Sequence, residues 1–131
     1  DPDHQLVPAA GAGRRAVLHL AAIGHGVMEK AVASSYERNR RPKEKVFDDW
    51  VTMIDGQVRG GLAALEQAAS KGDFLHGGHL SLADVNAAVA HDFVAIAVGY
   101  LLKDDPYPAL VALARRCNER SAFADTAFKP G

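Results

Sequence analysis

The segment 73–90, DFLHGGHLSLADVNAAVA, contains the side chains whose spacing comes nearest to that of a reactive site. His76 and His79 form an HxxH pattern, and imidazole nitrogens are common zinc ligands. Zinc requires three or four ligands, however, and no cysteine or further histidine pair stands at a suitable spacing. We therefore predict that the chain has no metal site.

The same segment also carries the signature of a helix start. Ser81 precedes Asp84 by three residues, as in a capping box, where the serine hydroxyl accepts from the Asp84 amide and the carboxylate accepts from the Ser81 amide. The following residues, VNAAVAHDFVAIAVGYLL, are apolar nearly all round, which predicts one helix through the middle of the domain. Ser81 and Asp84 are therefore interpreted as a structural cap on a buried central helix.

The other side chains with reactive potential favour structural roles. Cys117 follows Arg115 and Arg116 inside a predicted helix, away from the helix N-terminus or neighbouring base that a thiolate nucleophile needs. His91 and Asp92 interrupt the apolar central helix, a position that favours a hydrogen-bonded core histidine over a catalytic base. We assign no catalytic residue to the chain.

Composition is that of a soluble globular domain. The 131 residues fit one domain, since domains run to roughly 100 to 200 residues. A net charge of -1 gives no reason to expect nucleic acid or an anionic membrane as a partner. One cysteine cannot form an internal disulfide, which favours the cytoplasm, and no apolar run reaches the roughly 18 to 20 residues of a membrane span.

Long amphipathic segments predict an all-α fold of about five helices. One helix is expected from Arg14 to the RNRRP sequence, where Pro42 ends it, and a second along KEKVFDDW to about residue 70. Basic side chains cluster between the two helices, but acidic neighbours dilute them and no aromatic residue interleaves with them, so nucleic-acid binding is not predicted; the cluster is Arg38, Arg40, Arg41, Lys43 and Lys45. Residues 1–10 read as a linker that is entered midway, and 11–131 as the helical domain.

Ordered motifs along the chain strongly resemble the C-terminal helical domain of bacterial-type cytosolic glutathione transferases. The resemblance is carried by FLHGGHLSLADV at 74–85, by LAALE at 62–66 after Trp50, by HQLVP at 4–8, by YPAL at 107–110 and by RRCNERSAF at 115–123. It covers essentially the whole chain and implies a helical bundle with a capped central helix.

What the resemblance implies about function concerns a longer enzyme. Such transferases have an N-terminal thioredoxin-like domain that binds the co-substrate glutathione and activates its thiol, and no such domain is present in this sequence. By resemblance, this domain contributes the electrophile-binding side of the cleft, contacts the N-terminal domain and forms most of a homodimer interface. The implied whole is a cytoplasmic detoxification enzyme acting on hydrophobic electrophiles, and the chain alone is expected to be inactive.

The same resemblance singles out two residues as candidate substrate contacts. His25 and Glu29 lie four residues apart, on one helix face about 100 to 120 degrees from the apolar positions. Because the first helix of the resembling domains faces the cleft, these side chains are candidates to contact the electrophile, as is the tail carrying Phe123 and Phe128. The residues by themselves favour an exposed i,i+4 pair and a packed tail.

A second function stays open from the sequence. Helical domains of this kind also serve as non-enzymatic protein-interaction modules. The resemblance therefore leaves half of a transferase and a stand-alone interaction module as alternatives.

Overall fold

A computed structural model describes residues 5–104 and 106–129, and every regular element in this part is helical. The elements are α1 Gly11–Arg40, the 3-10 helix η1 Lys43–Lys45, α2 Asp48–Ala69, α3 Leu82–Ala97, α4 Leu101–Asp104, α5 Pro108–Asn118 and α6 Ser121–Ala124. The all-α prediction is confirmed. The first four residues of the predicted linker and the last two of the chain lie outside the described residues.

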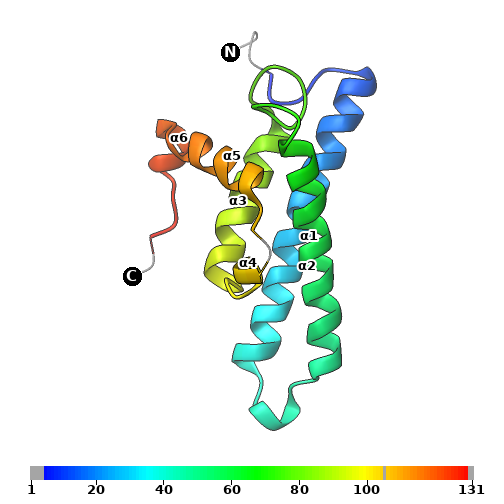
Figure 1. The fold of residues 1–131 in the computed structure, drawn as a ribbon, viewed down its shortest axis with the longest axis vertical. Coiled ribbons are helices and arrows are strands. Elements are labelled where there is room, and N and C mark those ends of the chain that lie inside the picture. The colour runs from blue at the N-terminus through cyan, green and yellow to red at the C-terminus, as the bar shows by residue number, and fades with distance from the viewer. Residues whose placement is uncertain (1–4, 105, 130–131) are drawn as a thin grey trace.

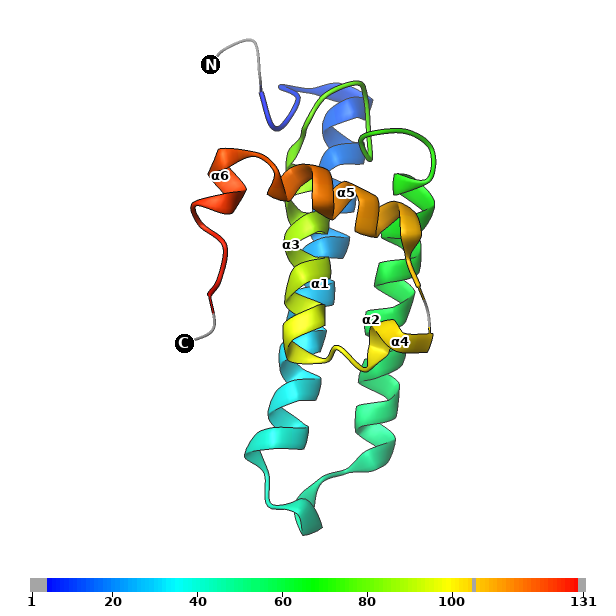
Figure 2. The ribbon, with the colours of Figure 1, turned by 60° about the vertical axis from the view of Figure 1, so that its left-hand side comes forward.

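A long antiparallel hairpin of α1 and α2 forms the frame of the molecule (Figures 1 and 2). The third helix, α3, packs along α1, and α5 crosses over both α3 and α2. The lower end of the hairpin, around η1, extends past the remaining helices. As a result α3 has neighbours on two sides and an open face on a third.

Small residues allow the helices to approach one another closely. A Cβ atom at Gly61 of α2 would lie 2.3 Å from Val27 Cγ2 of α1, so only glycine fits there without displacing the valine. A Cβ at Gly24 of α1 would lie 3.0 Å from the backbone of Asn86 on α3. The side-chain amide of Asn86 donates through Nδ2 to the backbone carbonyl of Ala21 at 2.9 Å, which fixes the crossing of the two helices. Helices α1 and α3 are in extensive contact, and Ala83, Ala87 and Ala90 of α3 are fully buried.

The predicted single helix from the central cap to Leu102 is interrupted, and this part of the prediction was wrong. Helix α3 ends at Ala97, and α4 begins only at Leu101. A Cβ atom at Gly99 would lie 2.6 Å from the Ala95 carbonyl oxygen, so the backbone turns where a side chain would not fit. The apolar pattern does not show this break, because apolar residues continue on both sides of it.

A side chain from α2 holds the start of α5. The Glu66 carboxylate accepts hydrogen bonds from the amides of Ala109, at 3.0 Å, and Leu110, at 2.7 Å. First-turn amides have no partner within their own helix, and a carboxylate also complements the positive end of the helix dipole. Glu66 therefore acts as a long-range cap that ties α5 to α2.

Candidate functional site

His25 and Glu29 lie on an exposed face of α1. The side chains are each 67% exposed, and His25 Nε2 lies 3.6 Å from Glu29 Oε1. Neither residue lines either of the two pockets described below. The structure thus brings the two side chains together, and it leaves them accessible to a ligand or a neighbouring domain.

Ser81 and Asp84 form a buried hydrogen-bonded unit at the start of α3. Both arms of a capping box are present, and the Ser81 amide donates to Asp84 Oδ2 at 2.8 Å. Asp84 also accepts from the Leu75 amide at 2.7 Å, which anchors the loop before the helix. The Leu82 amide donates to the carbonyl of Leu6 at 2.8 Å, so the segment before α1 satisfies another first-turn donor.

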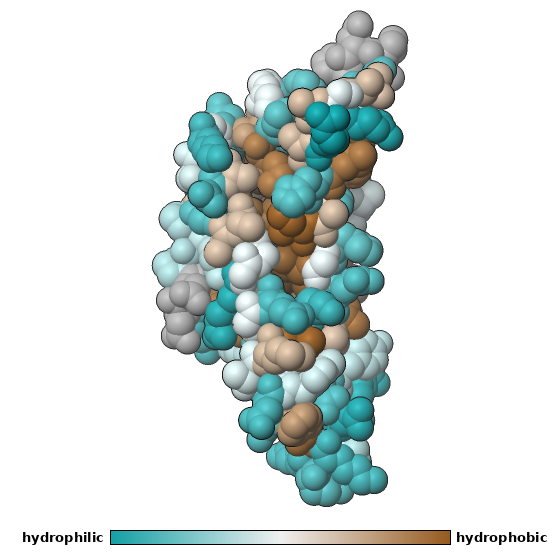
Figure 3. All heavy atoms as spheres, turned by 90° about the vertical axis from the view of Figure 1, so that its right-hand side faces the viewer, coloured by the Kyte–Doolittle hydropathy of each residue, from teal (hydrophilic) through white to brown (hydrophobic). Residues whose placement is uncertain are grey.

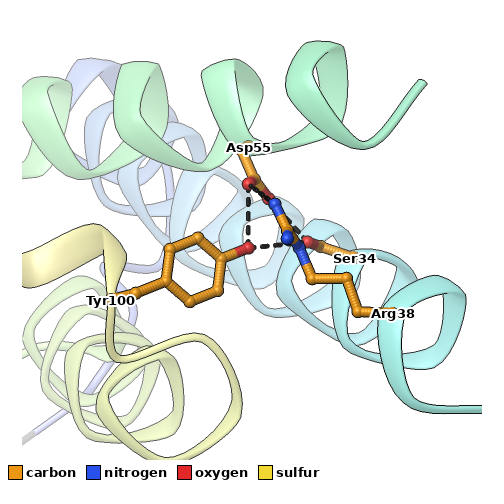
Figure 4. A network of polar contacts seen from close by, with 4 residues as sticks. All are labelled: Ser34, Arg38, Asp55 and Tyr100. Carbon is orange, nitrogen blue, oxygen red and sulfur yellow. Dashed lines mark hydrogen bonds and ion pairs between the residues drawn. The ribbon is translucent and has the colours of Figure 1, made fainter. Parts of the chain in front are cut away.

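A polar network that sequence reasoning missed joins α1, α2 and the turn after α3 (Figure 4). Asp55 of α2 accepts from the Ser34 hydroxyl at 2.5 Å, from the Tyr100 hydroxyl at 2.8 Å and from Arg38 at 2.9 Å. The Ser34 and Tyr100 hydroxyl oxygens lie 3.2 Å apart, and the Arg38 guanidinium stands 4.7 Å from the Tyr100 ring centroid. The carboxylate is therefore surrounded by donors from three segments.

The protonation states of this network suit its hydrogen bonds. Burial raises the pKa of Tyr100, so its hydroxyl remains a donor. Burial alone would lower the pKa of Arg38, but its hydrogen bond to Asp55 and the nearby charges raise it. The Asp55 carboxylate is bonded by Ser34, Arg38 and Tyr100, and this arrangement indicates a structural role in holding the segments together and not a general acid or base.

The sequence did contain one signal for this network. Asp55 stands in the buried register of α2, between Val51 and Val58, and Ser34 continues the buried register of α1. A carboxylate in such a register requires partners, because burying it unpaired is costly. Tyr100 carried no comparable signal, since its position depends on the break after α3.

An apolar pocket lies between α3, the end of α5 and the segment from α6 to residue 128. Its volume is about 530 Å³, and its lining is Val89, Asp92, Phe93, Ile96, Asn118, Phe123, Ala124, Thr126, Ala127 and Phe128. Phe123 is partly buried and packs against the core, whereas Phe128 is 71% exposed. Both phenylalanines therefore line the pocket, and Phe123 also packs against the core.

Charged and amide side chains mark one part of this pocket. Asp92 accepts from Asn118 Nδ2 at 2.8 Å, and its Oδ1 lies 3.2 Å from His91 Nδ1. The hydrogen bond with His91, assisted by that with Asn118, lowers the pKa of Asp92 although partial burial opposes the shift. The carboxylate is therefore ionised near neutral pH.

A second, more open hollow of about 590 Å³ lies between α2 and the segment before α5. Glu66 lines it together with Arg59 and Tyr107. Because the Glu66 carboxylate already caps α5, its oxygens are engaged by backbone amides. We consider the pocket beside α3 the better ligand site, because it is more enclosed and more apolar.

The remaining candidates have no reactive arrangement. Cys117 is 2% exposed, and burial raises the pKa of its thiol to about 11. Within residues 5–104 and 106–129, no three His, Cys, Asp or Glu side chains are grouped so as to hold a metal ion. In the same part of the chain, no helix is both long and apolar enough to cross a membrane.

Comparison with known proteins places the chain in a family. The model of the glutathione S-transferase C-terminal domain family matches residues 48–116, just over half of the chain. The chain therefore belongs to this family. No curated protein matches it.

Three solved structures that resemble the chain are glutathione transferases or members of that family. One from Methylobacterium radiotolerans, in complex with glutathione sulfonate, superposes with a TM-score of 0.90 at 23% identity, over 99% of this chain and 61% of its own; at that identity the likeness concerns the fold alone. One from Methylobacillus flagellatus, with glutathione bound, superposes with a TM-score of 0.89 at 26% sequence identity, over 97% of this chain and 62% of its own. A glutathione transferase family member from Pseudomonas fluorescens Pf-5, with bound S-(propanoic acid)-glutathione, superposes with a TM-score of 0.84 at 26% sequence identity, over 95% of this chain and 63% of its own. The chain spans about three-fifths of the length of each of these proteins.

Proposed function

We propose that this chain is the C-terminal domain of a glutathione S-transferase and forms the electrophile-binding side of its cleft. The observation that carries the proposal is the apolar pocket of about 530 Å³ beside α3, in a domain of this family. Phe93, Phe123 and Phe128 offer aromatic surface to a hydrophobic molecule. A thioredoxin-like N-terminal domain would bind glutathione, as the solved relatives bind it or its derivatives.

The chemistry assigns this domain a binding role. In the transfer, the glutathione thiolate attacks an electrophilic carbon, a carbon–sulfur bond forms, and the leaving group departs with its electron pair. The thiol of Cys117 is protonated and buried, so the nucleophile is the sulfur of glutathione. The pocket beside α3 orients the apolar body of the electrophile and excludes water from it.

His25 and Glu29, which line neither pocket, are proposed as polar contacts to a part of the electrophile that lies outside the pocket beside α3. Their support is their exposure on α1 and their mutual distance of 3.6 Å. We expect His25→Ala and Glu29→Gln to raise the KM for the electrophile severalfold with little change in kcat, because such contacts act on ground state and transition state alike. An unchanged KM in both variants would refute this role.

We also propose a homodimer that forms through α1 and α2. Figure 3 shows hydrophobic side chains in a strip along the face on which these two helices lie. Leu20 and Ile23 of α1 are only partly buried, and Ile23 lies beside Gly61 of α2. Sedimentation equilibrium should give twice the mass of the natural chain, and Ile23→Asp should shift it to the monomer.

Because the chain has one cysteine, which cannot form an internal disulfide, we propose a cytoplasmic location for the protein.

The test is a conjugation assay on the protein purified at its natural length. Glutathione and 1-chloro-2,4-dinitrobenzene should give the thioether and chloride, followed by absorbance. Phe128→Ala should raise the KM for the aromatic substrate severalfold, since it removes exposed lining of the pocket. Phe47→Ala is the matched control, because Phe47 is 62% exposed and lines neither pocket. Absence of turnover at natural length would refute the transferase and favour the protein-interaction module.

A further inference from the structure

Building on the proposed function, we propose that Asp92 makes the pocket beside α3 selective for electrophiles that carry a positive charge, and that it disfavours anionic ones. Asp92 is the acidic side chain of the lining, and Asn118 and Thr126 are its other polar side chains. The rest of the lining is aliphatic or aromatic. The charge of one residue thus sets the sign of the potential in an otherwise apolar pocket.

The Asp92 carboxylate is held in place and still open to a ligand. His91 from α3 and Asn118 from α5 each engage one of its oxygens, at 3.2 and 2.8 Å. A carboxylate oxygen can accept more than one hydrogen bond, and the side chain remains 43% exposed. The carboxylate is therefore oriented by the protein and able to accept from an ammonium group.

Neighbouring groups reinforce this preference. Among the described residues, the lining contains no lysine or arginine that would neutralise the carboxylate. Arg116 of α5 donates instead to the backbone carbonyl of Asp73 at 2.6 Å. Aromatic faces such as those of Phe93 and Phe128 attract cations, as they do in sites that bind quaternary ammonium groups. An anionic ligand would meet repulsion from Asp92, with no lysine or arginine in the described lining to offset it.

Three unreactive probes of one shape separate charge from hydrophobicity: 4-phenylbutylammonium, 4-phenylbutan-1-ol and 4-phenylbutyrate. Their binding to the natural-length protein is measured by titration calorimetry without glutathione. We expect the cation to bind about tenfold more tightly than the alcohol, as one charge-assisted hydrogen bond would give, and the anion to bind most weakly. Equal affinities for the three probes, or no binding of any, would overturn the proposal.

Variants assign the effect to the carboxylate. Asp92→Asn keeps the shape and should remove most of the advantage in affinity that the cation has over the alcohol, and the affinity for the alcohol itself should not change. Asp125→Asn is the matched control, because Asp125 is an exposed carboxylate near the tail and outside the lining. Phe128→Ala, at a position that is 71% exposed, should weaken the binding of all three probes, and that of the cation most, because it removes both apolar lining and an aromatic face. A cation affinity that survives Asp92→Asn would refute the role of Asp92.

Failure of this selectivity is distinguishable from failure of the proposed function. A protein that conjugates glutathione but binds the probes without regard to charge keeps its transferase function and loses the selectivity. A protein that binds the cation through Asp92 but conjugates no electrophile keeps the site and loses the transferase function.

Discussion

The Ser34 hydroxyl of α1 donates to Asp55 Oδ1 of α2 at 2.5 Å, and both residues are buried. This contact joins the two arms of the long hairpin at the level where α3 ends. Tyr100, which lies in the turn after α3, donates a further hydrogen bond to the same carboxylate. A buried charge is thus used to join three segments that are distant in sequence.

Removal of Asp55 should destabilise the fold strongly. Asp55→Ala leaves the Ser34 and Tyr100 hydroxyls without their acceptor, and we expect a loss of about 2–4 kcal/mol in the free energy of unfolding. Asp49→Ala, an exposed first-turn carboxylate on the same helix, should lose at most about 1 kcal/mol. Urea denaturation measures both values. Equal losses would show that the network contributes nothing beyond a surface charge.

Asp84 should be more important for stability than a surface carboxylate. It is 0% exposed, and Asp84→Ala deprives the amides of Leu75 and Ser81 of their acceptor. Since each of the two buried unsatisfied donors costs about 1–3 kcal/mol, we expect a loss of about 2–6 kcal/mol in the free energy of unfolding and a clearly lower Tm. Asp73→Ala, in the exposed loop nearby, should change stability by less than about 0.5 kcal/mol. A Tm for Asp84→Ala within error of the control would refute the cap.

Two adjacent glycines of α2 should respond to alanine in opposite directions. Nothing lies within 4 Å of a Cβ at Gly60, so Gly60→Ala should stabilise the helix by about 1 kcal/mol. A Cβ at Gly61 would lie 2.3 Å from Val27 Cγ2, so Gly61→Ala should destabilise by about 1–3 kcal/mol. Thermal unfolding distinguishes them. A stabilising Gly61→Ala would mean that α1 and α2 are less closely packed than the structure indicates.

Cys117 should make stability depend on alkaline pH. Burial raises the pKa of its thiol from an ordinary value of 9.0 to about 11, so the folded chain holds this proton more tightly than the unfolded chain. The contribution is fully present below pH 9 and is lost as the pH rises towards 11, by about 2–3 kcal/mol in total.

The variant Cys117→Ala isolates this effect. Tyrosines and lysines titrate in the same range in both proteins, so the difference between the two unfolding curves reports the thiol. Between pH 9 and 11 the wild-type chain should lose more stability than the variant. Parallel curves would show that the thiol ionises as readily in the folded chain as in the unfolded one.

Local features of this protein could be predicted from the residues alone. Apolar periodicity predicted the two long helices and the all-α class, because a helix buries every third or fourth side chain. The motifs around 62–85 indicated the glutathione transferase family, which the family match to residues 48–116 bears out. In each case the sequence pattern lies among residues that are close together in the chain, and so does the local structure that it predicts.

Contacts between distant residues were decided only by the tertiary structure. Ser34 and Tyr100, 66 positions apart, meet at Asp55, and the pocket beside α3 combines residues from 89 to 128. Uniform hydrophobicity around 94–102 gave no indication of the break at Gly99, because apolar side chains can be buried by either a straight or a turned chain. Helices form through hydrogen bonds between residues that are near in sequence, so they can be predicted from the local pattern of apolar residues. The partners of Asp55 and the lining of the pocket depend instead on how those helices pack.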